Sequence, residues 1–211
     1  MVDNEFYSKI NFSQKSSELS PATFFRYKQF FRYIIGKDKP LVVLDIGCNT
    51  GRGGAVLKKL NPNFFLIGVD CVEERLAIAS QIYDKVINCN AVSLPIENGF
   101  VDCVLAGEFV EHLTKTDALK AIREWYRVLK SGGQIILTTP NPNYFKLKLT
   151  GKSLLGGAHL AQYNPLELKN IVENLGFSLL KIKGSGRVAK YIGDSFPFLW
   201  LYGSFLISAV K

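Results

Sequence analysis

The sequence predicts an α/β fold: one doubly wound sheet of about seven strands, mostly parallel, with helices on both faces and the last strands partly antiparallel. Three observations predict this class. Short apolar runs, several of them rich in Val and Ile, alternate with longer stretches of helical character. Helix stop signals such as Asn61-Pro62 separate the two kinds of stretch, and a glycine-rich turn follows the first apolar run. Strands that alternate with helices in this way form βαβ units, whose parallel sheet is buried on both faces.

The first two thirds of the chain supply five of the expected strands and three of the expected helices. The strands are expected at the apolar runs 41–46, 64–69, 86–89, 101–106 and 134–138. The helices are expected between them, at 52–60, 73–82 and 117–129. The Ser-Gly-Gly turn at 131–133 ends the last of these helices.

The last third predicts one more helix and two late strands. Asn164 and Pro165 form a helix start, so a helix is expected from 166 to about 175, closed by Gly176. Apolar stretches at 177–182 and 205–210 then read as strands. Two strands that follow one another so late in the chain account for the expected antiparallel edge.

A further helix is expected near the N-terminus, with Ser20 as its cap and Pro21 in its first turn. One face of this helix carries an apolar stripe. The stripe consists of Phe24, Tyr27, Phe31 and Ile34. We therefore expect residues 1–39 to form a helical lid segment on a main domain of residues 40–211, the whole being a single domain.

Composition and termini indicate a cytoplasmic globular protein. Of the 211 residues, 47% are apolar and 21% charged, which is ordinary for a folded domain. The N-terminus carries acids where a signal peptide needs a positive region, and the uncharged run 195–210 is too short to span a membrane. The four cysteines are expected to be reduced thiols, since no CxxC pair suggests zinc or a disulfide framework.

Positive charge gathers in the last third of the chain. Residues 141–211 hold 9 Lys and Arg against 3 Asp and Glu, whereas residues 1–140 hold 17 against 15. Such an excess attracts anionic substrates, nucleic acid or membrane headgroups, and a merely solvated face is equally consistent with it.

The turn after the first strand reads DIGCNTGRGG from Asp45 to Gly54. It lacks the Lys-Ser/Thr that a phosphate-binding loop needs after its glycines, and it lacks the GxGxxG spacing of a dinucleotide clamp. Asp70 ends the second expected strand, nineteen residues past Gly51. A carboxylate there can accept both ribose hydroxyls of an adenosine moiety.

Five stretches in order resemble the class I S-adenosylmethionine-dependent methyltransferases, over roughly residues 42–177. They are the opening loop; VDC at 69–71; the segment from NCNAVSLP to VEHL; EWYRVLKSGGQIILTTPNP; and HLAQYNPLELKNIVENLGF. The last of these stretches is similar to the closing segment of the branches of this family that methylate small molecules. The resemblance implies a Rossmann-like fold, S-adenosyl-L-methionine as cofactor and S-adenosyl-L-homocysteine as product.

The resemblance also implies a role for each matching residue. Asp45, Gly47 and Gly51 surround the methionine end, Asp70 holds the ribose, and Asn90 and Ala91 lie along the adenine. Their neighbours Cys48, Asn49, Cys71 and Glu108 complete the expected cofactor site. Two positions depart from the family pattern. Asn49 replaces a glycine, but Asn tolerates positive φ. Asn90 replaces an Asp, but its carbonyl oxygen still accepts a hydrogen bond from an exocyclic amine.

The methylated atom is expected to be a hydroxyl oxygen. The [D/N]-P-P-[F/Y] motif of amino-methylating enzymes is missing after the fourth strand, where the chain reads AGEF, and NPNY at 141–144 follows the wrong strand. Methyl transfer to a hydroxyl oxygen needs a base, because an alcohol that keeps its O–H proton is a poor nucleophile. His112 and His159 are the candidate bases, with Glu111 as their acidic neighbour. His159 lies in the long loop 141–163, which we expect to act as a substrate lid.

No metal is expected, although one alternative exists. Glu108, Glu111 and His112 have the spacing i, i+3 and i+4, which places them on one face of a helical turn. The pattern is similar to one in quinone-biosynthesis O-methyltransferases, where it is associated with magnesium. A metal bound there could lower the pKa of an acceptor hydroxyl.

The expected partner is a small-molecule acceptor that is quinone-, glycan- or lipid-linked. The N-terminal stripe and the aromatic stretch 196–205 allow peripheral contact with a membrane or a lipid-linked substrate. Nucleic acid is not expected. RNA or protein methylation and non-catalytic cofactor binding remain the alternative functions. The sequence leaves the oligomeric state open.

Overall fold

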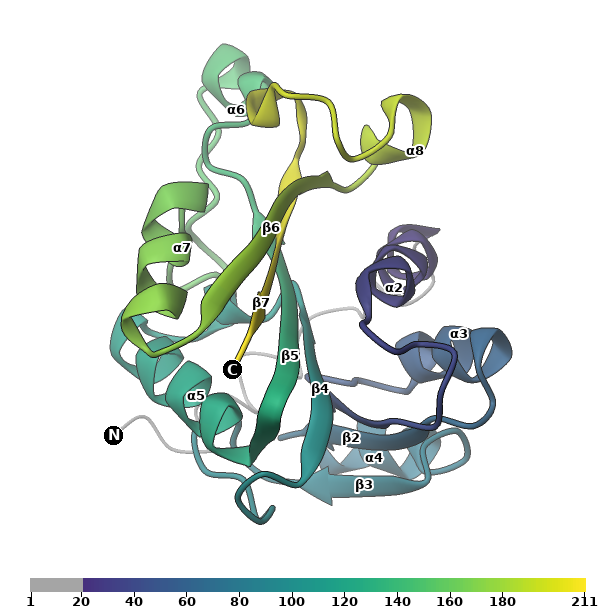
Figure 1. Cartoon of the computed structure of the whole chain (residues 1–211). Helices are drawn as coiled ribbons and strands as arrows, with labels where there is room; N and C mark the ends of the chain where they lie inside the picture. The colour runs from purple at the N-terminus through teal and green to yellow at the C-terminus, as the bar shows by residue number, and fades with distance from the viewer. Residues whose placement is uncertain (1–20) are drawn as a thin grey trace.

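A seven-stranded sheet forms the centre of the computed structural model, which describes residues 21–211 (Figure 1). The strand order is β3-β2-β1-β4-β5-β7-β6, and β7 runs antiparallel to both β5 and β6 while the other pairs are parallel. The strands are β1 Val42–Ile46, β2 Phe65–Asp70, β3 Lys85–Asn88, β4 Val101–Gly107, β5 Leu129–Pro140, β6 Ser178–Ser185 and β7 Ser204–Val210. The predicted fold class is confirmed.

Helices cover both faces of the sheet. One face packs against α2, α3 and α4, and the other against α5 and α7. The helices are α2 Pro21–Tyr33, α3 Arg52–Leu60, α4 Glu73–Ala79, α5 Lys115–Val128, α6 Phe145–Thr150, α7 Pro165–Asn174 and α8 Ala189–Ile192, with 3-10 turns η2 Val110–His112 and η3 Leu199–Leu201. None of these helices has the length and hydropathy needed to cross a bilayer. All four cysteines are free thiols, as predicted.

Several predicted boundaries were wrong, and two of the differences have a clear local reason. The helix expected at 73–82 ends at Ala79, because the chain turns there to bring Tyr83 back against the sheet. The strand expected from Gln134 begins at Leu129, since the Ser-Gly-Gly turn joins the strand through a register shift opposite Val101. The short elements α6, α8, η2 and η3 had no sequence signal.

The helix α2 packs on the sheet through a face that differs from the predicted stripe. Tyr27, Phe30 and Ile34 are buried, whereas Phe24 is exposed. The buried face follows the spacing i, i+3, i+7, which points one helix side at α3 and β4. The predicted cap Ser20 lies outside the described residues.

A buried carboxylate ties α2 to the sheet. Asp45 on β1 is fully buried, and both of its oxygens accept hydrogen bonds from the Tyr27 hydroxyl, at 2.7 and 2.9 Å. Tyr83, which follows α4, donates its hydroxyl to the same carboxylate. Burial raises the pKa of Asp45 to about 6, although the bonds from Tyr83 and Tyr27 act to lower it. Two segments far apart in sequence therefore meet on one charged group.

The glycines of α3 make room for these two tyrosine rings. A Cβ atom on Gly53 would come within 2.1 Å of Tyr27 Cζ, and one on Gly54 within 2.5 Å of Tyr83 Cζ. Real Cβ atoms do not approach other atoms so closely. The second half of the glycine-rich stretch is thus required by contacts inside the protein.

We predict that Gly53→Ala lowers the free energy of unfolding by about 1–3 kcal/mol, because the added methyl displaces the Tyr27 ring. Helix propensity alone predicts the opposite sign, since Ala is favoured over Gly by about 1 kcal/mol. Urea unfolding of both proteins measures the difference. In the matched control Ala55→Gly, at an exposed position of α3, only the propensity loss of about 1 kcal/mol is expected.

A double-mutant cycle identifies the cause. Gly53→Ala combined with Tyr27→Leu should show a coupling energy of about 1 kcal/mol or more, because the ring that the methyl displaces is gone. A stabilising Gly53→Ala, or additive effects in the cycle, would contradict the packing argument.

Candidate active site

A cavity of about 420 Å³ lies at the carboxyl ends of β1 to β4. The strands β1 and β4 are neighbours in the sheet, and their following helices α3 and α5 cover opposite faces. Ligands of doubly wound sheets bind at this kind of switch point. Eight residues of the predicted cofactor site line the cavity, together with the three predicted proton-transfer residues. They are Gly47, Cys48, Asn49, Asp70, Cys71, Asn90, Ala91 and Glu108, with Glu111, His112 and His159.

The loop after β1 is held open by backbone hydrogen bonds. Gly47 and Cys48 donate their N–H groups to the Val69 carbonyl oxygen at 2.8 and 3.0 Å. Asn49 has φ 52°, so the expectation that Asn can replace glycine in this turn is confirmed. Gly47 has φ 69°, and a Cβ atom there would lie 2.6 Å from the Phe109 ring. The loop therefore stays thin where it faces the cavity.

Asp70 lies at the end of β2 with both carboxylate oxygens already fixed in place. The N–H groups of Asn49 and Val72 each donate to one oxygen at 3.0 Å. A carboxylate oxygen accepts more than one hydrogen bond, so both remain able to receive hydroxyl donors from a ligand. This geometry suits the predicted contact with two ribose hydroxyls.

The segment after β3 is positioned by α5. Trp125 donates its indole N–H to the Ala91 carbonyl oxygen at 3.2 Å, and Glu124 accepts the Leu94 N–H at 2.7 Å. The Asn90 side-chain oxygen accepts the Val92 N–H at 3.2 Å and keeps a second lone pair. The predicted adenine side is thus a rigid wall.

Asp45 and Gly51, both predicted to contact the cofactor, do not line the cavity. The Asp45 carboxylate points away, to Tyr27 and Tyr83. Gly51 has φ 94° and precedes α3, where a Cβ atom would meet Ala79 and Ile82. The structure therefore gives both residues packing partners within the protein.

The expectation that Glu108, Glu111 and His112 share one helical face was wrong. Glu108 has φ 54° and precedes the 3-10 turn η2, which begins at Val110. Its Oε2 atom accepts a hydrogen bond from Ser204 at 3.1 Å. The left-handed backbone at Glu108 breaks the helical spacing and aims this side chain toward β7.

Glu111 is a buried acid beneath the cavity, with 1% of its surface exposed. Thr139 donates its hydroxyl to Glu111 Oε2 at 3.0 Å. Burial, reinforced by the nearby Glu108, raises the pKa of Glu111 well above its usual value. Among the described atoms, Oε1 of Glu111, Oε1 of Glu108 and Oδ1 of Asn49 are buried without a hydrogen-bond partner. All three residues line the cavity, which suits a ligand that brings donors.

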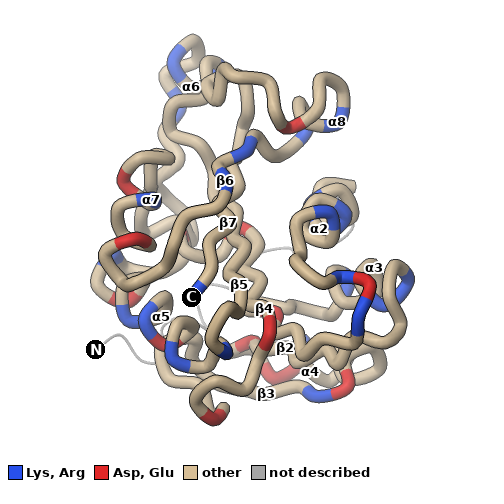
Figure 2. Tube along the Cα trace, viewed as in Figure 1, with Lys and Arg blue, Asp and Glu red and all other residues tan. Residues whose placement is uncertain are grey.

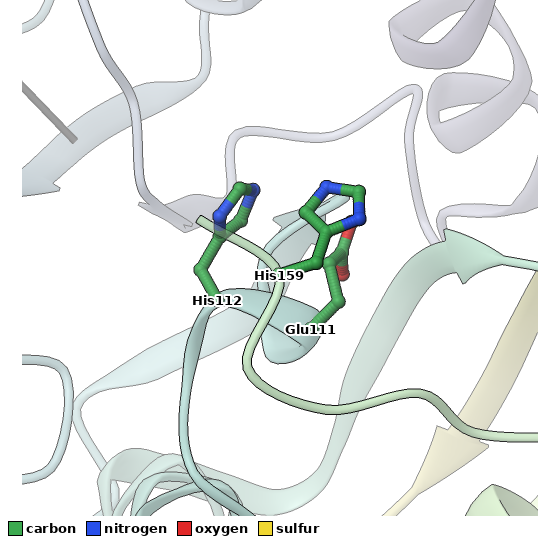
Figure 3. Close-up of side chains that lie close together, drawn as sticks. All are labelled: Glu111, His112 and His159. Carbon is green, nitrogen blue, oxygen red and sulfur yellow. The ribbon is translucent and has the colours of Figure 1, made fainter. Parts of the chain in front are cut away.

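The two histidines lie together although 47 positions separate them in the sequence. Their ring centroids are 4.9 Å apart with an interplanar angle of 79°. His112 and Glu111 rise from the same turn, and His159 reaches them from a separate loop (Figure 3). Leu160 and Ala161 anchor that loop by donating to the Glu111 carbonyl oxygen at 2.8 and 3.1 Å.

Backbone carbonyls fix the tautomer of both rings. His112 Nδ1 lies 3.1 Å from the Ala158 oxygen, and His159 Nδ1 lies 3.0 Å from the Leu154 oxygen. Because a carbonyl can only accept, Nδ1 carries the proton and Nε2 is the free base in each neutral ring. Burial, together with His159, lowers the pKa of His112 to about 4.

The ligand atoms of Glu111, His112 and His159 lie within 4.8 Å of one another. This group differs from the set that the sequence suggested, since it contains His159 in place of Glu108. One carboxylate and two imidazoles do not suit magnesium, which prefers oxygen ligands. We therefore derive no chemistry through magnesium.

Sequence reasoning missed Arg26 and Tyr27, which reach the cavity from α2, and Arg75 from α4. A single Arg or Tyr on an amphipathic helix gives no signal of its own. Only the packing of α2 and α4 on the sheet reveals that these side chains reach the cavity.

A family model described as a methyltransferase domain matches residues 44–137. An Arabidopsis thaliana tRNA (carboxymethyluridine(34)-5-O)-methyltransferase is 36% identical over 98 residues, which are 46% of this chain and 23% of that protein. A probable S-adenosylmethionine-dependent methyltransferase of Mycolicibacterium smegmatis is 29% identical over 72% of this chain and 56% of its own length. The chain thus spans only about a quarter to just over half of these two relatives. A demethylmenaquinone methyltransferase of Staphylococcus aureus is 27% identical over 87% of this chain and 89% of its length.

Solved structures show the same fold. A SAM-dependent methyltransferase from Archaeoglobus fulgidus has a TM-score of 0.70 and 25% identity, covering 98% of both chains. The magnesium protoporphyrin IX methyltransferase of Synechocystis, solved with bound SAH, has a TM-score of 0.71 and 15% identity over 99% of this chain and 97% of its own.

We predict that Asp70→Ala weakens the binding of S-adenosylhomocysteine by at least about tenfold, because two hydrogen bonds to a charged acceptor are lost. Calorimetric titration measures the affinity. Asp102→Ala is the matched control, since Asp102 also accepts a backbone N–H, from Val42 at 2.8 Å, away from the cavity. Unchanged affinity in Asp70→Ala, or an equal loss in both variants, would contradict the ribose contact.

Proposed function

We propose that this chain, whose residues 44–137 match a family model described as a methyltransferase domain, uses S-adenosylmethionine to transfer a methyl group to a hydroxyl of a small molecule. The observation that carries the proposal is the pair of tautomer-fixed histidines at the β4 side of the cavity. Both face the cavity that Asp70 and the Gly47 loop line on its β1–β2 side. A proton acceptor and a cofactor site therefore share one space.

The proposed arrangement follows the order of the strands. Asp70 holds the ribose, the loop of Gly47 and Asn49 holds the methionine part, and Ala91 borders the adenine. In this arrangement the methyl-bearing end of the cofactor lies toward β4, on the side of the cavity that Glu108 and His112 line. The bound cofactor supplies a methyl group on a sulfonium centre, and the neutral thioether that remains is a good leaving group. The residues of the chain need only align the acceptor and take up its proton.

His159 is the base that we favour. A general base works best when its pKa lies near the operating pH, and the pKa of His112 is lowered to about 4. In our proposal His159 Nε2 accepts the proton of the acceptor hydroxyl as the carbon–oxygen bond forms. His112 packs edge to face against this ring and holds the Ala158 carbonyl, so it orients the loop that carries His159.

A lipid-linked acceptor is supported by the far end of the molecule. Exposed aromatic side chains gather on the segments that follow α8 and form η3, with Phe198 and Trp200 in ring contact. Phe145 of α6 touches the same group. Lysines lie on the neighbouring helices, as the blue segments of α6 and α8 in Figure 2 show. We include peripheral contact with a membrane surface in the proposal.

RNA methylation is the second candidate function. The similarity to a tRNA methyltransferase and the basic last third of the chain favour it. A filter-binding assay with total tRNA at several salt concentrations separates the two candidates. Specific retention of tRNA that persists at physiological salt favours RNA, and loss of all retention favours the small molecule.

We predict that His159→Gln lowers kcat by roughly a hundredfold or more while S-adenosylhomocysteine affinity stays within about twofold. The reason is that the change removes the proton acceptor and leaves the cofactor wall intact. Transfer of a labelled methyl group to a panel of catechols, quinols and glycolipids provides the assay. His112→Gln serves as comparison and should lower kcat less.

Chelation provides the contrasting arm of the same experiment. Turnover of the wild type should survive treatment with EDTA. Turnover that EDTA abolishes would contradict the base mechanism, and turnover that survives both histidine changes would contradict the role of His159.

A further inference from the structure

A second cavity, of about 660 Å³, lies between α2 and α8. Its walls come from α2, from the start of α8 and from the adjacent ends of β6 and β7. Figure 1 shows α8 above α2, both to the right of β6 and β7. We call it the α2–α8 cavity. It is separate from the cofactor cavity except at one junction.

Among residues 21–211, five cationic side chains line the α2–α8 cavity, against a single acid, Glu108. The cations are Arg26, Lys28, Arg32, Arg187 and Lys190. Figure 2 shows blue segments on α2 and beside α8. Charges of one sign on a concave wall focus the potential inside it. The cavity therefore attracts anions.

The residues that the structure describes leave most of this charge without a paired carboxylate. Arg32 pairs with Asp194 at 3.0 Å, but within residues 21–211 no ion pair joins any of the other four cations to a carboxylate. Lys190 lies 4.9 Å over the Phe25 ring. A ring face leaves the ammonium free to bind a further anion. A single carboxylate would leave several cations unmatched, whereas a phosphate monoester or a diphosphate matches them better.

The α2–α8 cavity also has apolar surface, which can bind a part of the ligand other than its anionic group. Phe25, Phe31 and Leu60 form part of the wall, and Tyr191 stands at its edge with 77% of its surface exposed. A ligand with a charged head and an apolar body would fill both kinds of surface.

The junction with the cofactor cavity is formed by Ala22, Arg26 and Glu108, which line both spaces. Arg26 crosses the end of β4 at Gly107, where a Cβ atom would lie 2.8 Å from Arg26 Cδ. Glu108 Oε1 is buried there without a partner among the described residues. A hydroxyl of the ligand can donate to this oxygen while it points at the reacting end of the first cavity.

We propose that the α2–α8 cavity binds the acceptor and that this acceptor is a phosphate-bearing amphiphile. Arg187 and Lys190 hold its phosphate, the aromatic wall holds its apolar body, and Glu108 accepts a hydrogen bond from a hydroxyl other than the one whose proton His159 takes. The identification of the ligand as the acceptor rests on the proposed function, but the binding of the anion does not. A neutral quinol would leave the cations of this cavity unmatched.

Calorimetric titration with n-octyl phosphate tests the proposal, with n-octyl glucoside as the neutral probe of equal chain length. The proteins are the wild type, Arg187→Ala/Lys190→Ala, and Lys85→Ala, which removes a charge from an exposed position of β3 outside both cavities. The double variant should bind n-octyl phosphate at least about tenfold more weakly than the wild type, because two charge-assisted contacts are lost. Lys85→Ala should bind like the wild type, and the glucoside should not distinguish the three proteins.

Two further arms complete the design. Inorganic pyrophosphate tests the apolar part of the proposal. Binding as tight as that of n-octyl phosphate would contradict an amphiphilic ligand, and weaker binding supports a lipid-like one. S-adenosylhomocysteine is titrated into the same samples to show that each variant is folded. Suppose that S-adenosylhomocysteine binds all three proteins. If n-octyl phosphate then binds all three equally, or binds no better than the glucoside, the proposal for the α2–α8 cavity is overturned and the proposed function is not. If S-adenosylhomocysteine fails to bind the wild type, the proposed function is overturned, while the anion result still decides the nature of this cavity.

Discussion

The buried carboxylate of Asp45, held by the hydroxyls of Tyr27 and Tyr83, is the constraint on which the arrangement of the rest depends. A buried carboxylate without partners is costly, so the two tyrosines must reach it. Their rings cross the start of α3, and this requires glycine at 53 and 54. Because Tyr27 belongs to α2, the same interaction fixes where that helix lies and brings Arg26 across the end of β4.

The position of α2 in turn divides the functional surface into two spaces. On its inner side, the ends of β1 to β3 form a wall with fixed carboxylate, amide and backbone groups that suit an adenosine cofactor. On its outer side, α2 and α8 enclose a cationic space that suits an anion. Glu108 lies where the two meet, and the tautomer-fixed histidines border the inner space nearby. In the proposed function, the cofactor is therefore recognised mainly at the strand ends, and the acceptor is recognised between α2 and α8.

The fold, and many of the residues that line the cavity at the ends of β1 to β3, could be predicted from sequence because their signals are local. Apolar runs define the strands, and the turn from Asp45 to Gly54 together with Asp70 marks the ends of β1 and β2. The sequence could not predict why positions 53 and 54 must be glycine, because the tyrosine rings that pack there belong to α2 and to the segment after α4. The pairing of His112 with His159 and the role of Arg26 depend likewise on contacts between distant segments. The prediction that Glu108 shares a helical face with Glu111 and His112 was wrong, because residue spacing does not reveal a left-handed backbone at a single residue.

Hydrogen exchange of the α2 backbone amides in Tyr27→Phe tests most directly whether Asp45 holds this helix. The account predicts that the amides of 25–33 exchange at least about tenfold faster than in the wild type, while those of β1 and β4 keep their protection. Tyr126→Phe, which removes a hydroxyl from α5 instead, should leave the exchange of α2 unchanged. Unaltered protection of α2 in Tyr27→Phe, or equal acceleration across the whole sheet, would contradict the central role of this carboxylate.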